Sequence, residues 1–373
     1  MDFTLNNPIP PNGALLSFII QSIYRESMKI TIKLIFIVLI PLLGFSQSET
    51  KAPALLWKYQ MPYSNCSNAL VSDDKIYANC FDKAISKGYQ YAINKSNGSV
   101  IWERQIDEQL STPLVGENLA FYGSKNNKVI ALNAQNGQES WQFSNISGAV
   151  CTPPVLVNDQ LYFGTHTKEW CSINATTGKL ILNHKIGNGI CCEPTLDKKS
   201  VFYTDWDGKL HRFNTTHFTD SVIYRTTTSS HVAPVVKGNR GFMTNDDNSV
   251  ICVDLKTGKE YWTFRTDGKL WRPPTIADDI CMVITDSSHI YAFESTTGKL
   301  LWDEKKSGII YTSATILENI AYGGCGDKNL YAFDIRLGKE LWKLAFPENV
   351  EKVCIDKDIL YFSSGPNVYA YKK

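Results

Sequence analysis

Short stretches of alternating hydrophobic and polar residues recur along this chain at intervals of about forty residues. Each stretch predicts a β-strand with one buried face, because successive side chains of a strand point to opposite sides. The clearest copies lie at residues 91–102, 130–141, 251–262, 291–302 and 331–342. A repeat of this length that is rich in short strands is typical of a propeller blade. Residues 48–373 hold eight units, which predicts an all-β, eight-bladed propeller of four-stranded antiparallel blades.

Turn residues place the strands within each unit. In the second unit we expect strands at residues 111–115, 119–123, 129–133 and 139–143, from the innermost to the outermost. A glycine follows the third strand of most units, because a tight hairpin needs a positive φ there. Phe218 interrupts this glycine column. Since a bulky residue is strained at positive φ, we expect that turn to be built differently.

Tryptophans recur on the outermost strand of most units, where the gap between neighbouring blades is widest. The column contains Trp57, Trp102, Trp141, Trp262, Trp302 and Trp342, and Leu182 takes the same place in one degenerate unit. The first tryptophan strand, residues 55–59, precedes any complete unit, whereas the last unit ends without one. We therefore expect the N-terminal strand to complete the last blade and close the ring.

The N-terminal residues have the pattern of a targeting segment. Residues 28–47 place two lysines before an apolar run at 34–43 and small residues after it, which predicts a secretory signal peptide. Residues 1–27 match neither this pattern nor a blade, and we interpret them as an overlong start or a disordered segment. The apolar run is shorter than the ~20 residues that span a bilayer. We thus expect an exported protein, periplasmic or extracellular, with no transmembrane segment in its mature chain.

The net charge of +1 and the absence of a long basic run argue against nucleic acid as a partner.

The repeated YAxDxxTGKxxW pattern resembles the pyrroloquinoline-quinone-type repeat, also called the tryptophan-docking motif. The resemblance covers essentially the whole mature chain. The family includes quinoprotein alcohol dehydrogenases and the lipoprotein scaffold of the outer-membrane assembly machine. It implies a blade architecture rather than an activity, so the motif residues are interpreted as structural packing.

Candidate functional residues lie where the period is kept but the residue types vary. Just before the innermost strands, steps of forty lead to one position in successive units, and we expect these positions to circle one mouth of the central channel. The ligand-binding candidates are Cys151, Cys191, Cys192, Glu193, His231, Trp271, Arg272, Tyr311 and Glu351. The alternative is that a polar, wet channel mouth is common to any propeller.

Two chemistries at this mouth stay open. The resemblance implies that Cys191 and Cys192 form the disulfide that quinoproteins place against their quinone, although the acidic and amide calcium ligands of those enzymes have no counterpart here. Separately, Cys151, Cys191 and His231 occupy equivalent points on three blades and are residue types that bind zinc. No local pair of ligands supports a metal.

The function that we expect is a non-catalytic scaffold that binds protein or peptide partners in envelope or outer-membrane protein assembly. We expect a monomer with no resident cofactor, peripheral to the outer membrane if attached to it. The lipoprotein scaffold has a cysteine just after its signal, whereas residues 42–48 have none. The alternative is an oxidoreductase that depends on pyrroloquinoline quinone or a metal, or a ligand sensor, with its site at the channel mouth.

Overall fold

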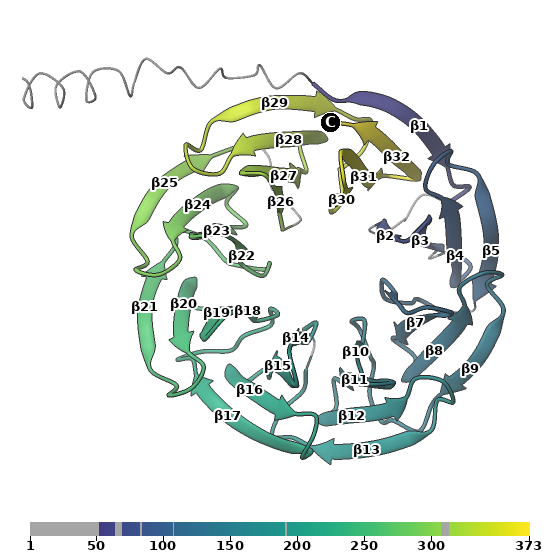
Figure 1. The fold of residues 1–373 in the computed structure, drawn as a ribbon, viewed down its shortest axis with the longest axis horizontal. Coiled ribbons are helices and arrows are strands. Elements are labelled where there is room, and N and C mark those ends of the chain that lie inside the picture. Colours follow the sequence, from purple (N-terminus) through teal and green to yellow (C-terminus); the bar gives the residue numbers. More distant parts are fainter. Residues whose placement is uncertain (1–51, 64–68, 83, 107, 191, 307–312) are drawn as a thin grey trace, which may run out of the picture. The chain divides into compact units, whose positions relative to one another are not determined.

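The computed structural model describes residues 52–63, 69–82, 84–106, 108–190, 192–306 and 313–373. These residues form eight four-stranded antiparallel sheets that follow one another around a ring (Figure 1). The predicted eight-bladed all-β propeller is confirmed. In the described part of the chain, no helix is long and apolar enough to cross a membrane.

The strands follow the repeat in order from the channel outward. Blades 1 to 4 consist of β2 (Leu70–Ser72), β3 (Lys75–Asp82), β4 (Lys87–Asn94) and β5 (Val100–Ile106); β6 (Leu114–Val115), β7 (Leu119–Ser124), β8 (Lys128–Asn133) and β9 (Glu139–Phe143); β10 (Val155–Val157), β11 (Gln160–Gly164), β12 (Glu169–Asn174) and β13 (Leu180–Lys185); and β14 (Thr195–Asp197), β15 (Ser200–Thr204), β16 (Lys209–Asn214) and β17 (Thr219–Arg225).

Blades 5 to 8 repeat this arrangement. They consist of β18 (Val235–Lys237), β19 (Arg240–Thr244), β20 (Ser249–Asp254) and β21 (Glu260–Arg265); β22 (Thr275–Ala277), β23 (Ile280–Ile284), β24 (His289–Glu294) and β25 (Leu300–Lys305); β26 (Thr315–Leu317), β27 (Ile320–Gly324), β28 (Asn329–Asp334) and β29 (Glu340–Ala345); and β30 (Cys354–Asp356), β31 (Ile359–Ser364), β32 (Asn367–Lys372) and β1 (Ala54–Gln60).

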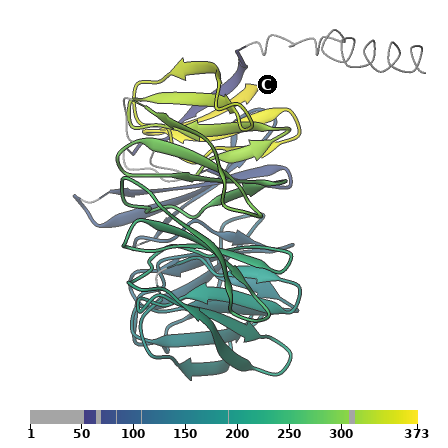
Figure 2. The same ribbon diagram turned by 90° about the vertical axis from the view of Figure 1, so that its left-hand side faces the viewer.

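The strands of each blade cross between two faces of the ring (Figure 2). Because neighbouring strands are antiparallel, all innermost strands begin at one face, which we call the entrance face. The turns between second and third strands also lie there. The opposite face, which we call the exit face, carries the turns from first to second and from third to fourth strands.

The last blade is closed by the N-terminal strand, as predicted. β1 pairs antiparallel with β32, and the register joins Ala54 to Lys372 and Gln60 to Asn367. The outermost strand of blade 8 therefore comes from the opposite end of the described chain. This pairing leaves no gap in the ring.

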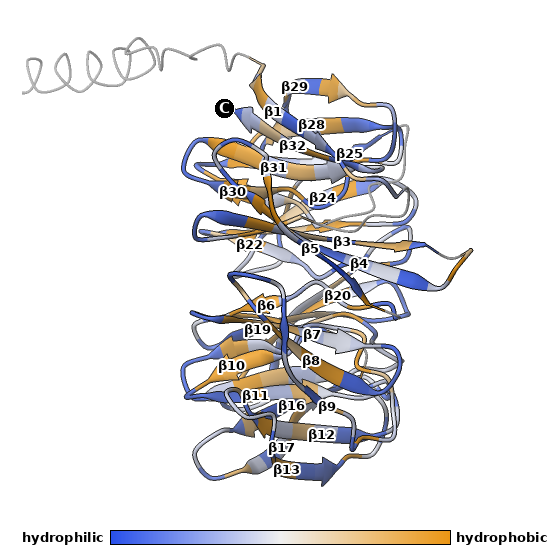
Figure 3. Cartoon of the chain, turned by 90° about the vertical axis from the view of Figure 1, so that its right-hand side faces the viewer, coloured by the Kyte–Doolittle hydropathy of each residue, from blue (hydrophilic) through white to orange (hydrophobic). Residues whose placement is uncertain are grey.

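The core lies in the two middle strands of each blade. β8 and β11 are buried almost throughout, whereas the outermost strand β13 is mostly exposed. Figure 3 shows the same division, with apolar colour on β8 and β11 and a largely hydrophilic β13. The outermost strands bury mainly the tryptophan that faces the next blade.

Each motif tryptophan docks on the glycine turn of the following blade. The ring of Trp57 lies so close to Gly98 that an added Cβ would be 2.6 Å from the indole, and Gly98 has a φ of +74°. The indole N–H of Trp57 donates to the carbonyl of Lys95 at 3.1 Å. The same arrangement joins Trp102 to Gly137, Trp141 to Gly178, Trp262 to Gly298 and Trp302 to Gly338. The glycines thus supply both a positive φ and room for an indole.

The expectation for Phe218 was wrong, because its turn has the same form as the others. Phe218 has a φ of +52°, and the Asn214 side chain accepts from the same two backbone amides as Asn133 does in its turn. The physical reason is that blade 3 carries Leu182 where other blades carry tryptophan. The smaller side chain leaves space, which Phe218 occupies with its ring 6.4 Å from Phe213. The loss of the tryptophan and the loss of the glycine are therefore linked.

Candidate functional site

The entrance face is held by a repeated backbone contact. In each of four blades, an amide at the turn between second and third strands donates to a carbonyl in the connection that leads to the next blade. The pairs are His166 to Ala149, Trp206 to Gly189, Asp246 to Ser229 and Asp286 to Lys269, at 2.9–3.1 Å. Each accepting carbonyl lies two residues before the forty-residue position that the sequence singled out. The contact therefore fixes these side chains on a rigid surface around the channel mouth.

Aromatic and imidazole rings meet along this surface. We call His166, Trp206 and His231 the aromatic arc, since their rings make contact across blades 3, 4 and 5. The His166 and Trp206 centroids are 5.2 Å apart, and those of Trp206 and His231 are 6.1 Å apart. His231 Nε2 lies 3.4 Å from a carboxylate oxygen of Asp246. On blade 6, Trp271 is 47% exposed and has the Lys269 ammonium 5.3 Å from its ring centroid.

Charged side chains from three blades face one another at the channel mouth. Partial loss of water raises the pKa of Glu193, and the positive charge of Lys352 on blade 8 opposes that rise. Desolvation also raises the pKa of Glu351, against the pull of Arg272, and lowers the pKa of Arg272 itself. Blades 4, 6 and 8 therefore contribute two acids and two bases whose charges interact across the mouth.

Blade 8 is one residue out of step with the forty-residue spacing. Cys354 pairs with Tyr361 as Thr275 pairs with Met282. This register places Glu351 in the column of Arg272, and the buried Val350 in the column of Trp271. Lys352 then shares the column of Glu193, which the count of residues alone did not reveal.

The structure places the candidates from the sequence as follows. Glu193, His231, Trp271, Arg272 and Glu351 lie on the entrance face, and Cys151 lies there partly exposed. Cys191 and Tyr311 fall outside the described residues. The residues that the sequence did not single out are Trp206, His166 and Lys352. A tryptophan off the docking column was the available signal for Trp206.

The cysteine chemistry of a quinoprotein does not fit this site. Cys192 is a free, buried thiol whose Sγ lies 3.3 Å from both the carbonyl and the hydroxyl oxygen of Thr204, inside the blade. A disulfide platform facing a quinone needs this sulfur bonded to its neighbour and turned to the channel. Within the described ranges, no group of three or more His, Cys, Asp and Glu side chains is arranged to hold a metal ion.

Comparison with known proteins identifies the family. A family model described as outer membrane protein assembly factor BamB matches residues 54–189 and 215–371. The chain belongs to this family. Its repeats are of the pyrroloquinoline-quinone type, as the sequence pattern predicted.

Curated relatives match parts of the chain at low identity. An outer membrane protein assembly factor BamB from Legionella pneumophila is 26% identical over 184 residues, which are 46% of this chain and 48% of that protein. The BamB protein of Moranella endobia is 28% identical over 120 residues, 32% of this chain and 31% of its own length. The chain thus spans about half the length, or less, of the curated relatives that it matches.

Solved structures share the fold. BamB from Moraxella catarrhalis superimposes with a TM-score of 0.70 at 15% identity and covers 87% of this chain and 98% of its own. The computationally designed Ika8 protein reaches 0.73 at 15% identity and covers 86% and 100%. At this identity the likeness concerns the fold alone.

Proposed function

We propose that this protein is an exported, non-catalytic scaffold that binds a protein partner at its entrance face during outer-membrane protein assembly. Its place is the periplasm, peripheral to the outer membrane, and it acts as a monomer after removal of residues 28–47. The family supplies the process, since the matching model and relatives carry the name of an assembly factor. The surface of the chain supplies the docking site.

The observation that carries the proposal is the aromatic surface around the mouth. Trp271 is 47% exposed, and Trp206 and His231 stand beside it on the neighbouring blades. Tryptophan and arginine are enriched at the centres of protein interfaces, where they form most of the binding hot spots. Arg272 follows Trp271 directly. Rigid loops present these groups, so binding does not require the loops to become ordered first.

The proposal assigns no resident quinone or metal. The buried Cys192 thiol turns away from the channel, which favours a binding role for the mouth over quinone chemistry. Absorbance of the purified protein and metal analysis test this part directly. A bound quinone in native protein would replace the scaffold by an oxidoreductase.

The experiment places a photo-crosslinking amino acid at Trp271 in the native host. A matched control carries the same group at Leu301 on β25, which is 44% exposed but lies on the outer strand. We expect crosslinks from position 271 to a subunit of the outer-membrane assembly machine and none from position 301. We also expect deletion of the gene to lower the amount of β-barrel proteins in the outer membrane.

A second variant measures the affinity. Trp271→Ala should weaken binding of the crosslinked partner by about tenfold or more, which corresponds to at least about 1.4 kcal/mol. Its melting temperature should stay close to that of the wild type, because the side chain is exposed. Equal crosslinking from both positions, or unchanged outer-membrane proteins in the deletion strain, would refute the proposal.

A further inference from the structure

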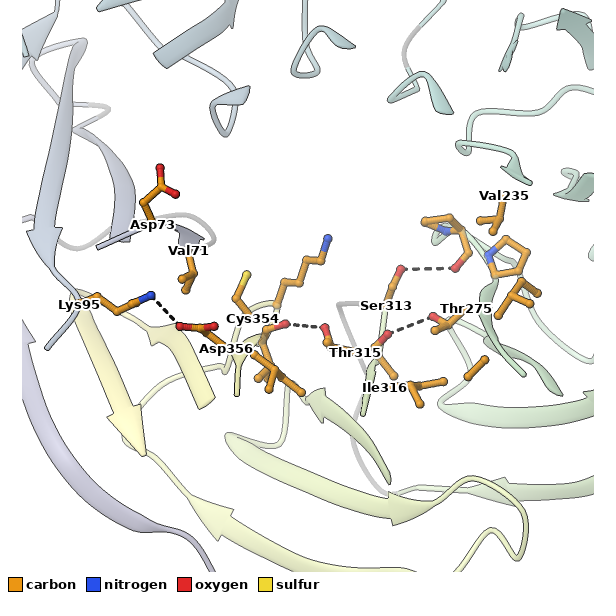
Figure 4. Close-up of a pocket in the computed structure, with 18 residues that line it drawn as sticks. Val71, Asp73, Lys95, Val235, Thr275, Ser313, Thr315, Ile316, Cys354 and Asp356 are labelled. Atoms are coloured by element: carbon orange, nitrogen blue, oxygen red, sulfur yellow. Dashed lines mark hydrogen bonds and ion pairs between the residues drawn. The ribbon is translucent and has the colours of Figure 1, made fainter. Parts of the chain in front are cut away.

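The wall of the channel contains a cavity of about 840 Å³. Its lining comes mainly from the innermost strands β22, β26 and β30, with contributions from blades 5 and 1 (Figure 4). The volume lies within the usual range for binding sites of small ligands and short peptides. This cavity is separate from the aromatic arc on the entrance face, because none of the three arc residues lines it.

The innermost strands present unpaired backbone edges to this cavity. β22, β26 and β30 each pair on one side, with β23, β27 and β31. In the described part of the chain, their other edge pairs with no strand. Amide and carbonyl groups along such an edge are a template for an added extended chain.

Aliphatic side chains surround the channel at the middle of the innermost strands. One residue per blade shares this register, and all eight are at least partly exposed. We call them the aliphatic collar: Val71, Val115, Leu156, Leu196, Val236, Ile276, Ile316 and Ile355. Val71, Ile276, Ile316 and Ile355 line the cavity. Exposed aliphatic groups that gather in a concave surface mark a binding site rather than a solvated wall.

Polar side chains at the start of these strands bond within the wall. Thr275 donates to the carbonyl of Ala314 at 3.1 Å, and Thr315 donates to that of Val353 at 2.5 Å. The Cys354 thiol lies 3.1 Å from the carbonyl of Ala69 and continues this belt from blade 8 to blade 1. The belt fixes the spacing of the blades, so the strand edges and the collar are preorganised for a ligand.

The charges that line the cavity differ between its two ends. Lys352 lies at the entrance end, whereas Asp73 lies in the β2–β3 turn at the exit end. Lys95 and Asp356 also line the exit end, but their ion pair of 2.6 Å is neutral as a unit. The cavity is therefore positive at one end, aliphatic in the middle and negative at the other.

We propose that the channel binds a short extended peptide segment with an acidic residue at one end, alternating aliphatic residues, and a basic residue at the other end. The peptide backbone pairs with an innermost strand, its aliphatic side chains contact the collar, and its charges face Lys352 and Asp73. Alternation matters because only every second side chain of an extended chain faces the collar. This site is independent of the docking role proposed for the entrance face.

The test uses a capped, fluorescein-labelled peptide of sequence Glu-Val-Thr-Ile-Thr-Lys and fluorescence anisotropy with the purified intact protein at low salt. Ile316→Asp should weaken binding about tenfold or more, because a carboxylate among aliphatic side chains loses its water. Leu301→Asp on the outer strand is the matched control and should bind like the wild type. A peptide with N-methylated amides at alternate positions should also bind about tenfold more weakly, because it loses backbone pairing.

A charge exchange keeps the proposal testable if Ile316→Asp fails to fold. Lys352→Glu should weaken binding of the acidic-ended peptide and strengthen binding of a peptide with lysine at both ends. The absence of saturable binding to the wild type, equal binding of the N-methylated peptide, or equal effects of the Ile316 and Leu301 variants would each overturn the inference. Crosslinks from Trp271 would be unaffected by any of these results, so the two proposals fail separately.

Discussion

The contact between Trp302 and Gly338 allows the docking motif to be tested as a coupled pair. An added Cβ at Gly338 would lie 2.7 Å from Cδ2 of the Trp302 indole, and the glycine has a φ of +70°. We predict that Gly338→Ala is costly while the indole is present and much less costly once the indole is removed. A double-mutant cycle measures this difference directly.

The magnitudes follow from the geometry. Trp302→Ala should lower the free energy of unfolding by about 3 kcal/mol, the lower end for a tryptophan truncation, because the ring is partly exposed. Gly338→Ala should cost about 1 kcal/mol for the left-handed backbone, plus about 1–3 kcal/mol for the overlap with the indole. Only the backbone cost remains when Trp302 is alanine. The coupling free energy should therefore be about 1–3 kcal/mol.

Urea unfolding of the four proteins, followed by tryptophan fluorescence and circular dichroism, gives the free energies. Unchanged m-values would show that the comparison concerns stability alone. Blade 3 offers a natural control, because Leu182 replaces the tryptophan and Phe218 the glycine. If Gly338→Ala costs the same in both backgrounds, within about 0.5 kcal/mol, the indole does not determine the glycine and our account of Phe218 fails.

Three further outcomes are expected. Deleting residues 54–60 removes the outermost strand of blade 8 and should lower the melting temperature strongly; a truncated protein that melts like the mature one would rule out closure by β1. Burial opposes the charged form of His211, but hydrogen bonds with Asp205 and Asp220 at 3.3 and 2.7 Å raise its pKa. The charged imidazole should therefore stabilise the fold fully below the ordinary pKa of about 6.5, and the stability lost in His211→Gln should shrink as pH rises through the raised pKa; a difference that grows with pH would contradict this sign. Cys354→Val removes the last inter-blade bond of the belt and should cost about 1 kcal/mol in urea unfolding, whereas Cys354→Ser should retain most of it.

The architecture was predictable because each blade repeats the same physical requirements. A period near forty, a turn glycine and an outer tryptophan appear in the sequence wherever one blade packs on the next. Phe218 was misjudged because its turn was considered alone. The residue that decides the available space is Leu182, on the preceding blade, and a comparison of the two columns would have revealed the link.

The candidate site was less accessible to sequence reasoning. The forty-residue step located the entrance face but assigned Glu351 to the wrong column, because blade 8 is one residue shorter before its innermost strand. Lys352 was missed for the same reason. The aromatic arc depends on loop conformations that bring Trp206 to His166 and His231, and no periodic pattern records such contacts. The strand edges and the collar emerge only when the innermost strands are placed around a common axis.

The register of the closing strand also determines how the ring resists force. Because β1 and β32 are antiparallel and Ala54 lies opposite Lys372, the two ends of the described ring leave the seam at the same point. A pull between these ends would load the β1–β32 hydrogen bonds one after another, like the opening of a zipper, instead of all at once in shear. The seam should therefore yield at low force although the closed ring is stable at equilibrium. Attachment through one end alone would leave this weak direction unloaded.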